Sequence, residues 1–231
     1  MIVTELNQGI KLYLLVGGRG TRLASITNGK PKPLVDVHDN PFLDYVLNNL
    51  KGFDITLVCS SLNYDYFKEY EKVGVEVFNE GDPSGTAGFL CKVDLPESFY
   101  VMNGDTFFPG ELNLDAIRST VFVNLEETTG DEGYIIGGND GRVEAYIEKD
   151  PNSVGKTNYV NLGIYKLYKK DINIPDKLPL SMEYDILPNM DLSYKILKSD
   201  RFDIGTPERL ERFKTWLPST SSEQKEILAV D

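Results

Sequence analysis

A glycine-rich loop followed by basic side chains is the part of this sequence whose residue types are best suited to chemistry. The loop, residues 17–20, follows an apolar run, and glycines in such a turn let backbone N–H groups approach phosphate oxygens. Arg22 and Lys32 come soon after it, and both side chains can bind phosphate. The loop lacks the Gly-Lys-Ser/Thr ending of a Walker loop, and Leu23 stands where the dinucleotide-binding fingerprint needs its third glycine. These cations also fit a solvated face, but their place beside the glycines favours a phosphate-binding loop of another kind.

Two aspartates are candidate ligands for a metal ion. Asp105 comes just after an apolar run at 99–102, and so lies where open α/β sheets bind ligands if that run is a strand. Asp203 precedes an Ile-Gly-Thr-Pro segment, and can also be read as a residue upstream of a helix cap. Mg²⁺ prefers a few protein carboxylates completed by phosphates and water. A shared magnesium site therefore requires the two aspartates to converge, which the sequence pattern alone leaves open.

The elements that must position these residues follow from hydrophobic periodicity. Over residues 10–110 the pattern alternates between strand and helix, which predicts a doubly wound, largely parallel sheet. The predicted strands there are 10–16, 55–59, 75–78 and 99–102, and the predicted helices are 42–50, 64–72 and 87–93. Beyond residue 111 the pattern predicts strands joined by hairpin-like turns, at 120–124, 134–137, 142–147, 163–168 and 194–198. A last helix is expected at 207–217, with Thr206 as its N-cap and Pro207 at its first position.

Composition narrows the classes of partner. The 231 residues carry a net charge of −12, which disfavours binding to nucleic acid because phosphate contacts dominate that affinity. Cys59 and Cys91 form neither a metal-binding spacing nor a disulfide framework, which favours a reducing compartment, the cytoplasm. We find no signal-peptide pattern and no run near the ~20 apolar residues that span a bilayer, so no membrane partner is expected. His38 precedes a turn and has no cysteine or histidine partner, so we expect it at the surface.

Six segments, taken in order, resemble the motifs of sugar-1-phosphate nucleotidyltransferases over residues of about 10 to 217. The pattern is most similar to bacterial heptose-1-phosphate guanylyltransferases and the related mannose and muramate enzymes. The resemblance implies a Rossmann-like three-layer α/β/α fold around a mixed, mostly parallel sheet, the nucleotide-diphospho-sugar transferase fold. The matching segments are 17–23 with 31–33, then 80–88, 103–105, 148–149, 161–165 and 203–207.

The resemblance also assigns roles to individual residues. Catalysis falls to Arg22, Lys32 and Asp105, with Mg²⁺ on Asp105 and Asp203. The implied nucleotide-binding residues are Gly17, Gly18, Gly20, Thr21, Glu80, Gly85, Thr86 and Gly88. The implied sugar-phosphate residues are Gly133, Glu148, Lys149, Asn161 and Gly163. Purely structural interpretations remain open for three of these residues. Lys149 can be a solvated lysine, Asn161 can lie at a strand edge, and Gly163 can form a turn.

Asp150 departs from the family pattern, which often has proline there, but it leaves the Glu148-Lys149 pair intact. Glu183 resembles a family segment near the sugar, although capping by Ser181 explains it equally well.

We therefore expect one nucleotidyltransferase domain over 1–217, with a nucleotide-binding half at about 10–110, a sugar-binding half at about 111–217 and a flexible tail at 218–231. The expected reaction joins a nucleoside triphosphate to a sugar 1-phosphate with Mg²⁺. In the family that the chain resembles, Gly17-Gly18 occurs in the branches that use guanine or thymine, and the overall resemblance favours GTP with heptose or mannose 1-phosphate. A homo-oligomer is left open. The first alternative is a cytidylyltransferase acting on phosphocholine or another non-sugar phosphate. A non-catalytic sensor and a glycosyltransferase are weaker alternatives, since the four expected catalytic and metal residues are present and an Asp-x-Asp motif is not.

Overall fold

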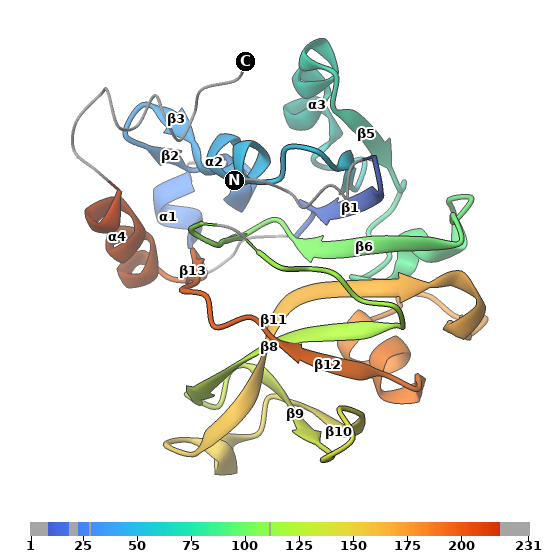
Figure 1. Cartoon of the computed structure of the whole chain (residues 1–231). Coiled ribbons are helices and arrows are strands. Elements are labelled where there is room, and N and C mark those ends of the chain that lie inside the picture. Colours follow the sequence, from blue (N-terminus) through green and yellow to red (C-terminus); the bar gives the residue numbers. More distant parts are fainter. Residues whose placement is uncertain (1–8, 19–22, 28, 111, 218–231) are drawn as a thin grey trace.

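A nine-stranded mixed sheet runs through the computed structural model, which describes residues 9–18, 23–27, 29–110 and 112–217 (Figure 1). Its main path is β10-β9-β11-β6-β1-β4-β5, with β8 paired to β11 and β12 paired to β8. The strands of the first half are β1 (Lys11–Leu15), β4 (Asp54–Cys59), β5 (Glu76–Asn79) and β6 (Ser98–Asn103). Those of the second half are β8 (Thr120–Glu127), β9 (Gly133–Gly137), β10 (Val143–Glu148), β11 (Thr157–Tyr168) and β12 (Ser193–Ile196).

The two halves of the sheet differ in strand direction, as the sequence pattern predicts. In the first half β1 pairs in parallel with both β4 and β6, and β4 pairs in parallel with β5. In the second half β11 pairs antiparallel with β6, β8 and β9, and β9 pairs antiparallel with β10. Among the strands that the structure describes in this half, β12 alone pairs in parallel, against β8. The mixed sheet is confirmed, and its parallel character is concentrated in the half that carries the glycine loop.

The helices are short and lie on both faces of the sheet. The α-helices are α1 (Ala24–Thr27), α2 (Phe42–Asn49), α3 (Tyr64–Phe67) and α4 (Pro207–Trp216). Short 3₁₀ helices cover Lys32–Leu34, Lys68–Val73, Gly88–Cys91, Pro151–Ser153, Lys169–Asp171 and Leu187–Asn189, and Met182–Ile186 forms one π-helical turn. The helix expected at 64–72 is thus split, and the one expected at 87–93 is a single 3₁₀ turn. None of the helices within the described ranges has the length and apolar character needed to cross a membrane.

Alternation along β1 divides the core into two layers. Leu12 and Leu14 belong to a cluster with α2 and α4, while Tyr13 belongs to a second cluster with the 88–91 and 182–186 turns. Period-two alternation in a strand buried on both faces produces this arrangement. The three-layer prediction is therefore confirmed.

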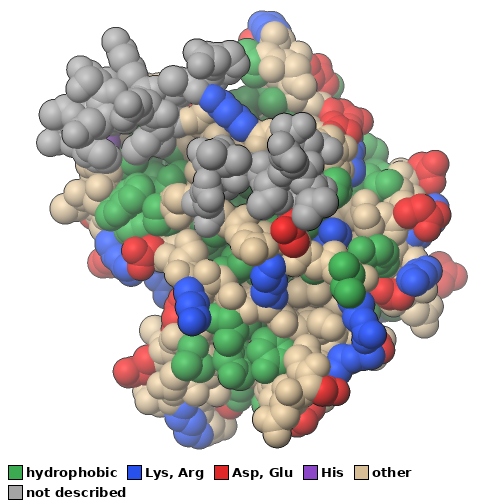
Figure 2. Space-filling view, viewed as in Figure 1, with side chains coloured by type: hydrophobic (Ala, Val, Ile, Leu, Met, Phe, Trp, Pro, Cys, Tyr) green, Lys and Arg blue, Asp and Glu red, His purple; other side chains and the backbone are tan. Residues whose placement is uncertain are grey.

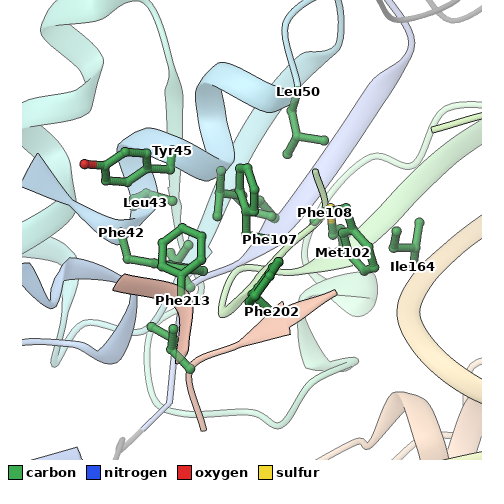
Figure 3. Packing of buried hydrophobic residues seen from close by; sticks show 14 of the residues in the cluster. Phe42, Leu43, Tyr45, Leu50, Met102, Phe107, Phe108, Ile164, Phe202 and Phe213 are labelled. Carbon is green, nitrogen blue, oxygen red and sulfur yellow. The ribbon is translucent and has the colours of Figure 1, made fainter. Parts of the chain in front are cut away.

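Aromatic rings fill the layer beneath α4 (Figure 3). Phe213 of α4 lies with its ring centroid 5.0 Å from Phe42, 5.2 Å from Phe107 and 5.6 Å from Phe202. Phe107 and Phe202 belong to the two-residue strands β7 (Thr106–Phe107) and β13 (Phe202–Asp203), which pair antiparallel. A second small ribbon, β2 (Asp36–Val37) with β3 (Asn40–Pro41), leads into α2. The ring cluster thus anchors β13, which ends at Asp203, and β7, which begins just after Asp105.

Candidate active site

Asp105 and Asp203 lie side by side because β7 and β13 pair. Asp203 is the register partner of Thr106, and the backbone N–H of Ile204 donates to the carbonyl of Asp105 at 3.0 Å. The contact spans nearly a hundred residues of sequence, and the phenylalanines of the same two strands hold it in the core. The convergence that the sequence left open is therefore present.

A close backbone approach sets Asp105 beside the glycine loop. Gly104 donates its N–H to the carbonyl of Leu15 at 2.9 Å. A Cβ at this position would lie 2.8 Å from Val16 Cγ1 and 2.9 Å from the Leu15 carbonyl oxygen, so a side chain would push the two strand ends apart. Glycine at 104 thus lets the ends of β6 and β1 meet, as ligand sites at the carboxyl edge of a parallel sheet require.

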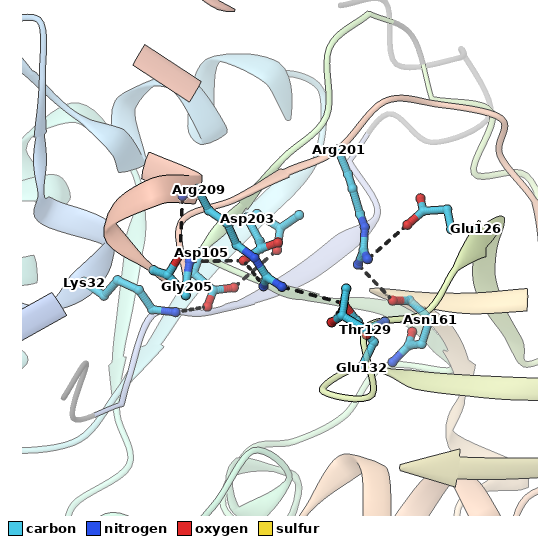
Figure 4. Close-up of polar contacts among 12 residues, drawn as sticks. Lys32, Asp105, Glu126, Thr129, Glu132, Asn161, Arg201, Asp203, Gly205 and Arg209 are labelled. Carbon is cyan, nitrogen blue, oxygen red and sulfur yellow. Dashed lines mark hydrogen bonds and ion pairs between the residues drawn. The ribbon is translucent and has the colours of Figure 1, made fainter. Parts of the chain in front are cut away.

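Each aspartate holds a cation from the chain itself (Figure 4). Lys32, at the start of a 3₁₀ turn with buried Pro33 and Leu34, forms an ion pair with Asp105, and the two side chains are 22% and 32% exposed. Asp203 accepts from Arg209 Nη1 at 2.8 Å and from the N–H of Gly205 at 3.1 Å. The Lys32–Asp105 ion pair is partly exposed, and it is not part of the sequence prediction, which assigns Lys32 to the triphosphate.

The donor set fits a magnesium ion. Asp105 lies in the turn just before β7 and Asp203 on β13, and both side chains keep part of their surface exposed, 32% for Asp105 and 26% for Asp203. Within the described ranges no group of three or more His, Cys, Asp or Glu side chains is arranged to hold a metal. An ion here would complete its shell with phosphate oxygens and water, which is the coordination that Mg²⁺ prefers.

A cavity of about 260 Å³ opens beside the glycine loop. Five residues assigned to the nucleotide line it: Gly17, Gly18, Glu80, Gly85 and Thr86. Lys30 and Pro31 line it too, from the connector that carries Lys32. Gly88 is not among the lining residues, since it is buried, and a Cβ there would lie 2.2 Å from Ser84 Oγ. Gly20, Thr21 and Arg22, also assigned to this site, lie outside the described residues, as does the 218–231 tail.

Thr86 joins the nucleotide cavity to the second half of the chain. Its hydroxyl donates to Glu183 Oε2 at 2.8 Å and accepts from the backbone N–H of Met182 at 2.8 Å. Ser181 also donates to Glu183 Oε2, at 2.8 Å, and caps the 182–186 turn. Ser181 therefore caps the turn, while Glu183 contacts Thr86 of the nucleotide cavity and, in addition to burial, raises the pKa of Glu148, one of the residues assigned to the sugar.

The residues assigned to the sugar gather around the hydroxyl of Tyr146. Asn161 Nδ2 donates to Tyr146 Oη at 2.7 Å, and that hydroxyl lies 3.5 Å from Glu148 Oε2. Asn161 Oδ1 accepts from the N–H of Gly163 at 2.9 Å. Gly133 faces the same group, since a Cβ there would lie 2.4 Å from Glu148 Oε2. These contacts bring four of the five predicted sugar residues into one polar cluster.

The carboxyl group of Glu148 is held in an unusual state. Burial, with Glu183 nearby, raises the pKa of Glu148 to about 7, although Lys149 and the Tyr146 hydrogen bond act the other way. Lys149 itself is exposed and takes a φ of +53°, a left-handed conformation that a non-glycine residue seldom adopts. Such outliers persist where surrounding structure fixes them, often at functional sites.

Two members of the site could have been found by a finer reading of the sequence. Tyr146 stands two residues before Glu148, so strand alternation puts both on one face. Arg209 occupies the third position of a capped helix, where an acidic residue is usual. The surface prediction for His38 is confirmed, since it is exposed and its ring contacts the carbonyl of Lys214 at 2.9 Å.

Comparison with known proteins gives one family and several relatives. The sequence model of the family described as "Nucleotidyl transferase" matches residues 11–215. The chain is 30% identical over 230 residues to the mannose-1-phosphate guanylyltransferase catalytic subunit beta of Drosophila pseudoobscura pseudoobscura, covering 89% of this chain and 62% of that protein. It is also 30% identical over 221 residues to the D-glycero-alpha-D-manno-heptose 1-phosphate guanylyltransferase of Campylobacter jejuni, covering 88% of this chain and 98% of the relative. The crystal structure of HddC from Yersinia pseudotuberculosis complexed with GMP-PN matches with a TM-score of 0.74 and 28% identity, over 90% of this chain and all of that one.

Proposed function

The chain belongs to the nucleotidyl transferase family, and from that premise we propose that it joins GTP to a sugar 1-phosphate and releases pyrophosphate. Heptose or mannose 1-phosphate is the proposed acceptor, since the relatives named above act on these two sugars. Because the chain spans less than two thirds of the length of several relatives, this proposal concerns the described catalytic fold. The cytoplasmic location and the division into nucleotide and sugar halves belong to the same proposal.

One observation supports the proposal most. The Lys32–Asp105 ion pair and Asp203 stand at a sheet edge with the nucleotide-type cavity on one side and the Tyr146 cluster in the other half. Thr86, which lines the cavity, donates a hydrogen bond to Glu183, and Glu183 in turn, in addition to burial, raises the pKa of Glu148. An enzyme that transfers between two phosphorylated substrates needs this order of a nucleotide site, a charged edge and an acceptor site.

The proposed chemistry needs no nucleophilic side chain. A sugar phosphate is mostly a dianion at neutral pH, since its second pKa is about 6, and one of its oxygens attacks the α-phosphorus of the nucleotide. A P–O bond forms there as the bond to the β-phosphate oxygen breaks, and pyrophosphate carries away the electron pair. Mg²⁺, held by Asp105 and Asp203, would supply charge neutralisation between the two phosphate groups.

The chain's own part is then alignment and electrostatics. Lys32 stabilises the charge that develops on the leaving pyrophosphate, and Lys149 holds the phosphate of the sugar. Glu148 accepts hydrogen bonds from hydroxyl groups of the sugar. The Tyr146 hydroxyl and Asn161 fix the position of the Glu148 side chain. Arg22 is assigned to the triphosphate by family resemblance alone.

The test is a substrate panel. The full chain is incubated with Mg²⁺, each nucleoside triphosphate in turn, and heptose, mannose, glucose or muramate-type 1-phosphates or phosphocholine, while pyrophosphate release is measured. We expect the highest kcat/KM with GTP and heptose or mannose 1-phosphate. A preference for CTP and phosphocholine would overturn the proposal in favour of the cytidylyltransferase alternative. No release with any pair would favour a non-catalytic sensor.

A further inference from the structure

Arg209 occupies a helix position that local preferences disfavour. It is the third residue of α4, and its N–H donates to the side chain of the N-cap Thr206 at 3.3 Å. Glutamate or glutamine is typical there, because it can return a hydrogen bond to the cap, and a cation in the first turn opposes the helix dipole. A local rule broken in this way needs compensation elsewhere, and such exceptions concentrate at functional sites.

The compensation comes from two carboxylates on different elements (Figure 4). Arg209 Nη1 lies 2.8 Å from Asp203 Oδ1, and its Nη2 lies 3.6 Å from Glu132 Oε1. Glu132 is only 12% exposed and is fixed in its turn by Thr129, which donates to it from Oγ1 at 2.7 Å and from its backbone N–H at 3.1 Å. The guanidinium therefore has one rigid anchor, Glu132, and one partner, Asp203, that has a second use.

That second use is the divalent cation assigned to Asp105 and Asp203. A cation bound to Asp203 and the guanidinium at 2.8 Å would compete for the same carboxylate. We propose that Arg209 is an internal competitor for Asp203, which neutralises this carboxylate in the ligand-free protein and holds its affinity for divalent metal low. The inference rests on the metal site of the proposed function, but not on which substrates are used.

The surroundings give the displaced side chain a place to go. Arg209 lies on the wall of an open cavity of about 790 Å³, together with Asp203, Glu132, Arg201 and Arg212. The Arg209 side chain is 35% exposed, so it can leave Asp203 while it keeps Glu132. The metal ion then binds most readily together with a nucleotide, because the phosphates complete the coordination shell of the ion and offset the positive charge of the displaced Arg209 guanidinium.

Manganese titration of the nucleotide-free full chain tests the proposal, with free Mn²⁺ measured by electron paramagnetic resonance. We expect Arg209→Gln to tighten Mn²⁺ binding about tenfold, which corresponds to ~1.4 kcal/mol. Arg209→Lys, which keeps the charge but loses the planar fork, is expected to fall between the wild type and Arg209→Gln. Arg212→Gln is the matched control: it removes the same charge one turn further along α4, from a guanidinium that stacks 5.2 Å from the Phe202 ring centroid, and it should leave Mn²⁺ affinity within twofold.

The combination of Glu132→Gln with Arg209→Gln separates competition from simple charge removal, because loss of a nearby carboxylate weakens cation binding under either account. Glu132→Gln frees Arg209 to pair more firmly with Asp203, so Mn²⁺ binding should weaken severalfold. In the Arg209→Gln background the same change should have a clearly smaller effect, because only the loss of the carboxylate charge remains and the competitor is gone. Unchanged or weaker binding in Arg209→Gln, an equal gain in Arg212→Gln, or an undiminished Glu132→Gln effect in the double variant would each overturn the proposal. Because this titration uses no substrate, its outcome is independent of the substrate panel that tests the proposed function.

Discussion

At the scale of single residues, Lys32 has the most direct link to the proposed chemistry. It lies between two prolines in a stiff connector, and its ion pair with Asp105 is partly exposed. A cation that stabilises a leaving group matters more in the transition state than in the ground state. Lys32→Ala is therefore expected to lower kcat by roughly 10²–10³, with a much smaller rise in the KM for GTP.

Two further variants make this test specific. Lys32→Arg should recover only part of the rate, since a planar fork does not replace a compact ammonium in a tight site. Lys68→Ala removes the same charge from an exposed helical pair with Asp65 and should leave steady-state rates near the wild-type value. Near-native kcat in Lys32→Ala at saturating substrates would mean that Lys32 is only a surface residue of the turn.

Glu148 gives a pH-dependent prediction at the same scale. Its pKa of about 7 in the folded protein exceeds the ordinary 4.5, so the folded state binds more protons between these values. The free energy of unfolding therefore falls as pH rises from 4.5 to 7, because the buried Glu148 carboxyl group must ionise. Above pH 7 the full cost of burying this charge is present. Glu148→Gln should raise the melting temperature at pH 8 and have little effect at pH 5, measured by calorimetry.

The control for this prediction lies on the same strand. Glu144→Gln changes an exposed carboxylate of β10 and should shift the melting temperature equally little at both pH values. Glu148→Gln should also weaken binding of the sugar phosphate, because a neutral amide accepts weaker hydrogen bonds from hydroxyl groups than a carboxylate does. A stability gain of the same size at pH 5 and pH 8 would contradict the raised pKa.

At the scale of elements, the contact between the segment 84–87 and Leu180 shapes the nucleotide cavity. Gly85 has a φ of +87°, and a Cβ there would lie 2.1 Å from the carbonyl oxygen of Leu180. The flanking hydrogen bonds, Leu180 N–H to Ser84 O at 2.8 Å and Ala87 N–H to Leu180 O at 3.0 Å, leave no room for the segments to separate. Gly85→Ala should destabilise the fold by about 2–4 kcal/mol, from overpacking plus backbone strain.

Gly74→Ala separates these two contributions. Gly74 has nearly the same backbone, with a φ of +83°, but a Cβ there meets nothing within 4 Å. The strain alone should cost about 1–2 kcal/mol. Urea unfolding of both variants gives the comparison, and equal losses would mean that the contact with Leu180 yields without cost.

The same scale shows what the sequence could predict. Strands such as β1, β4 and β6 could be predicted because each is a short buried run bounded by turn residues. The pairing of β7 with β13 could not, since two-residue strands carry no periodic signal and their contact joins residues 106 and 203. The helix expected at 87–93 is a 3₁₀ turn at Gly88–Cys91, just after the hydrogen bond that Ala87 N–H donates to the Leu180 carbonyl. Candidate site residues were therefore identifiable by type, while their convergence depended on long-range pairing.

At the scale of the whole molecule, charge is the main obstacle to the proposed reaction. The chain carries 36 acidic and 24 basic residues, and both proposed substrates are anions. Figure 2 shows acidic and basic side chains interspersed over the face in view, rather than a single basic surface that would draw anions in. Because the overall negative charge repels anionic substrates, their binding must depend on cations placed locally at the site, as composition alone indicates.

Removing divalent metal should accordingly abolish turnover. Without it Asp105 and Asp203 would add their own charge to that of two phosphorylated substrates held within a few ångströms, a repulsion of several kcal/mol. Pyrophosphate release is measured in excess chelator and again after Mg²⁺ is restored, and we expect loss followed by recovery.

Asp105→Asn and Asp203→Asn should each reduce the rate at saturating Mg²⁺, whereas Asp191→Asn, which changes a 78% exposed aspartate paired with Arg142, should not. Turnover that persists in chelator, or equal rates in all three variants, would contradict the assignment of a metal to these strands, because the protein's own Lys32 and Arg209 would then suffice to neutralise the site.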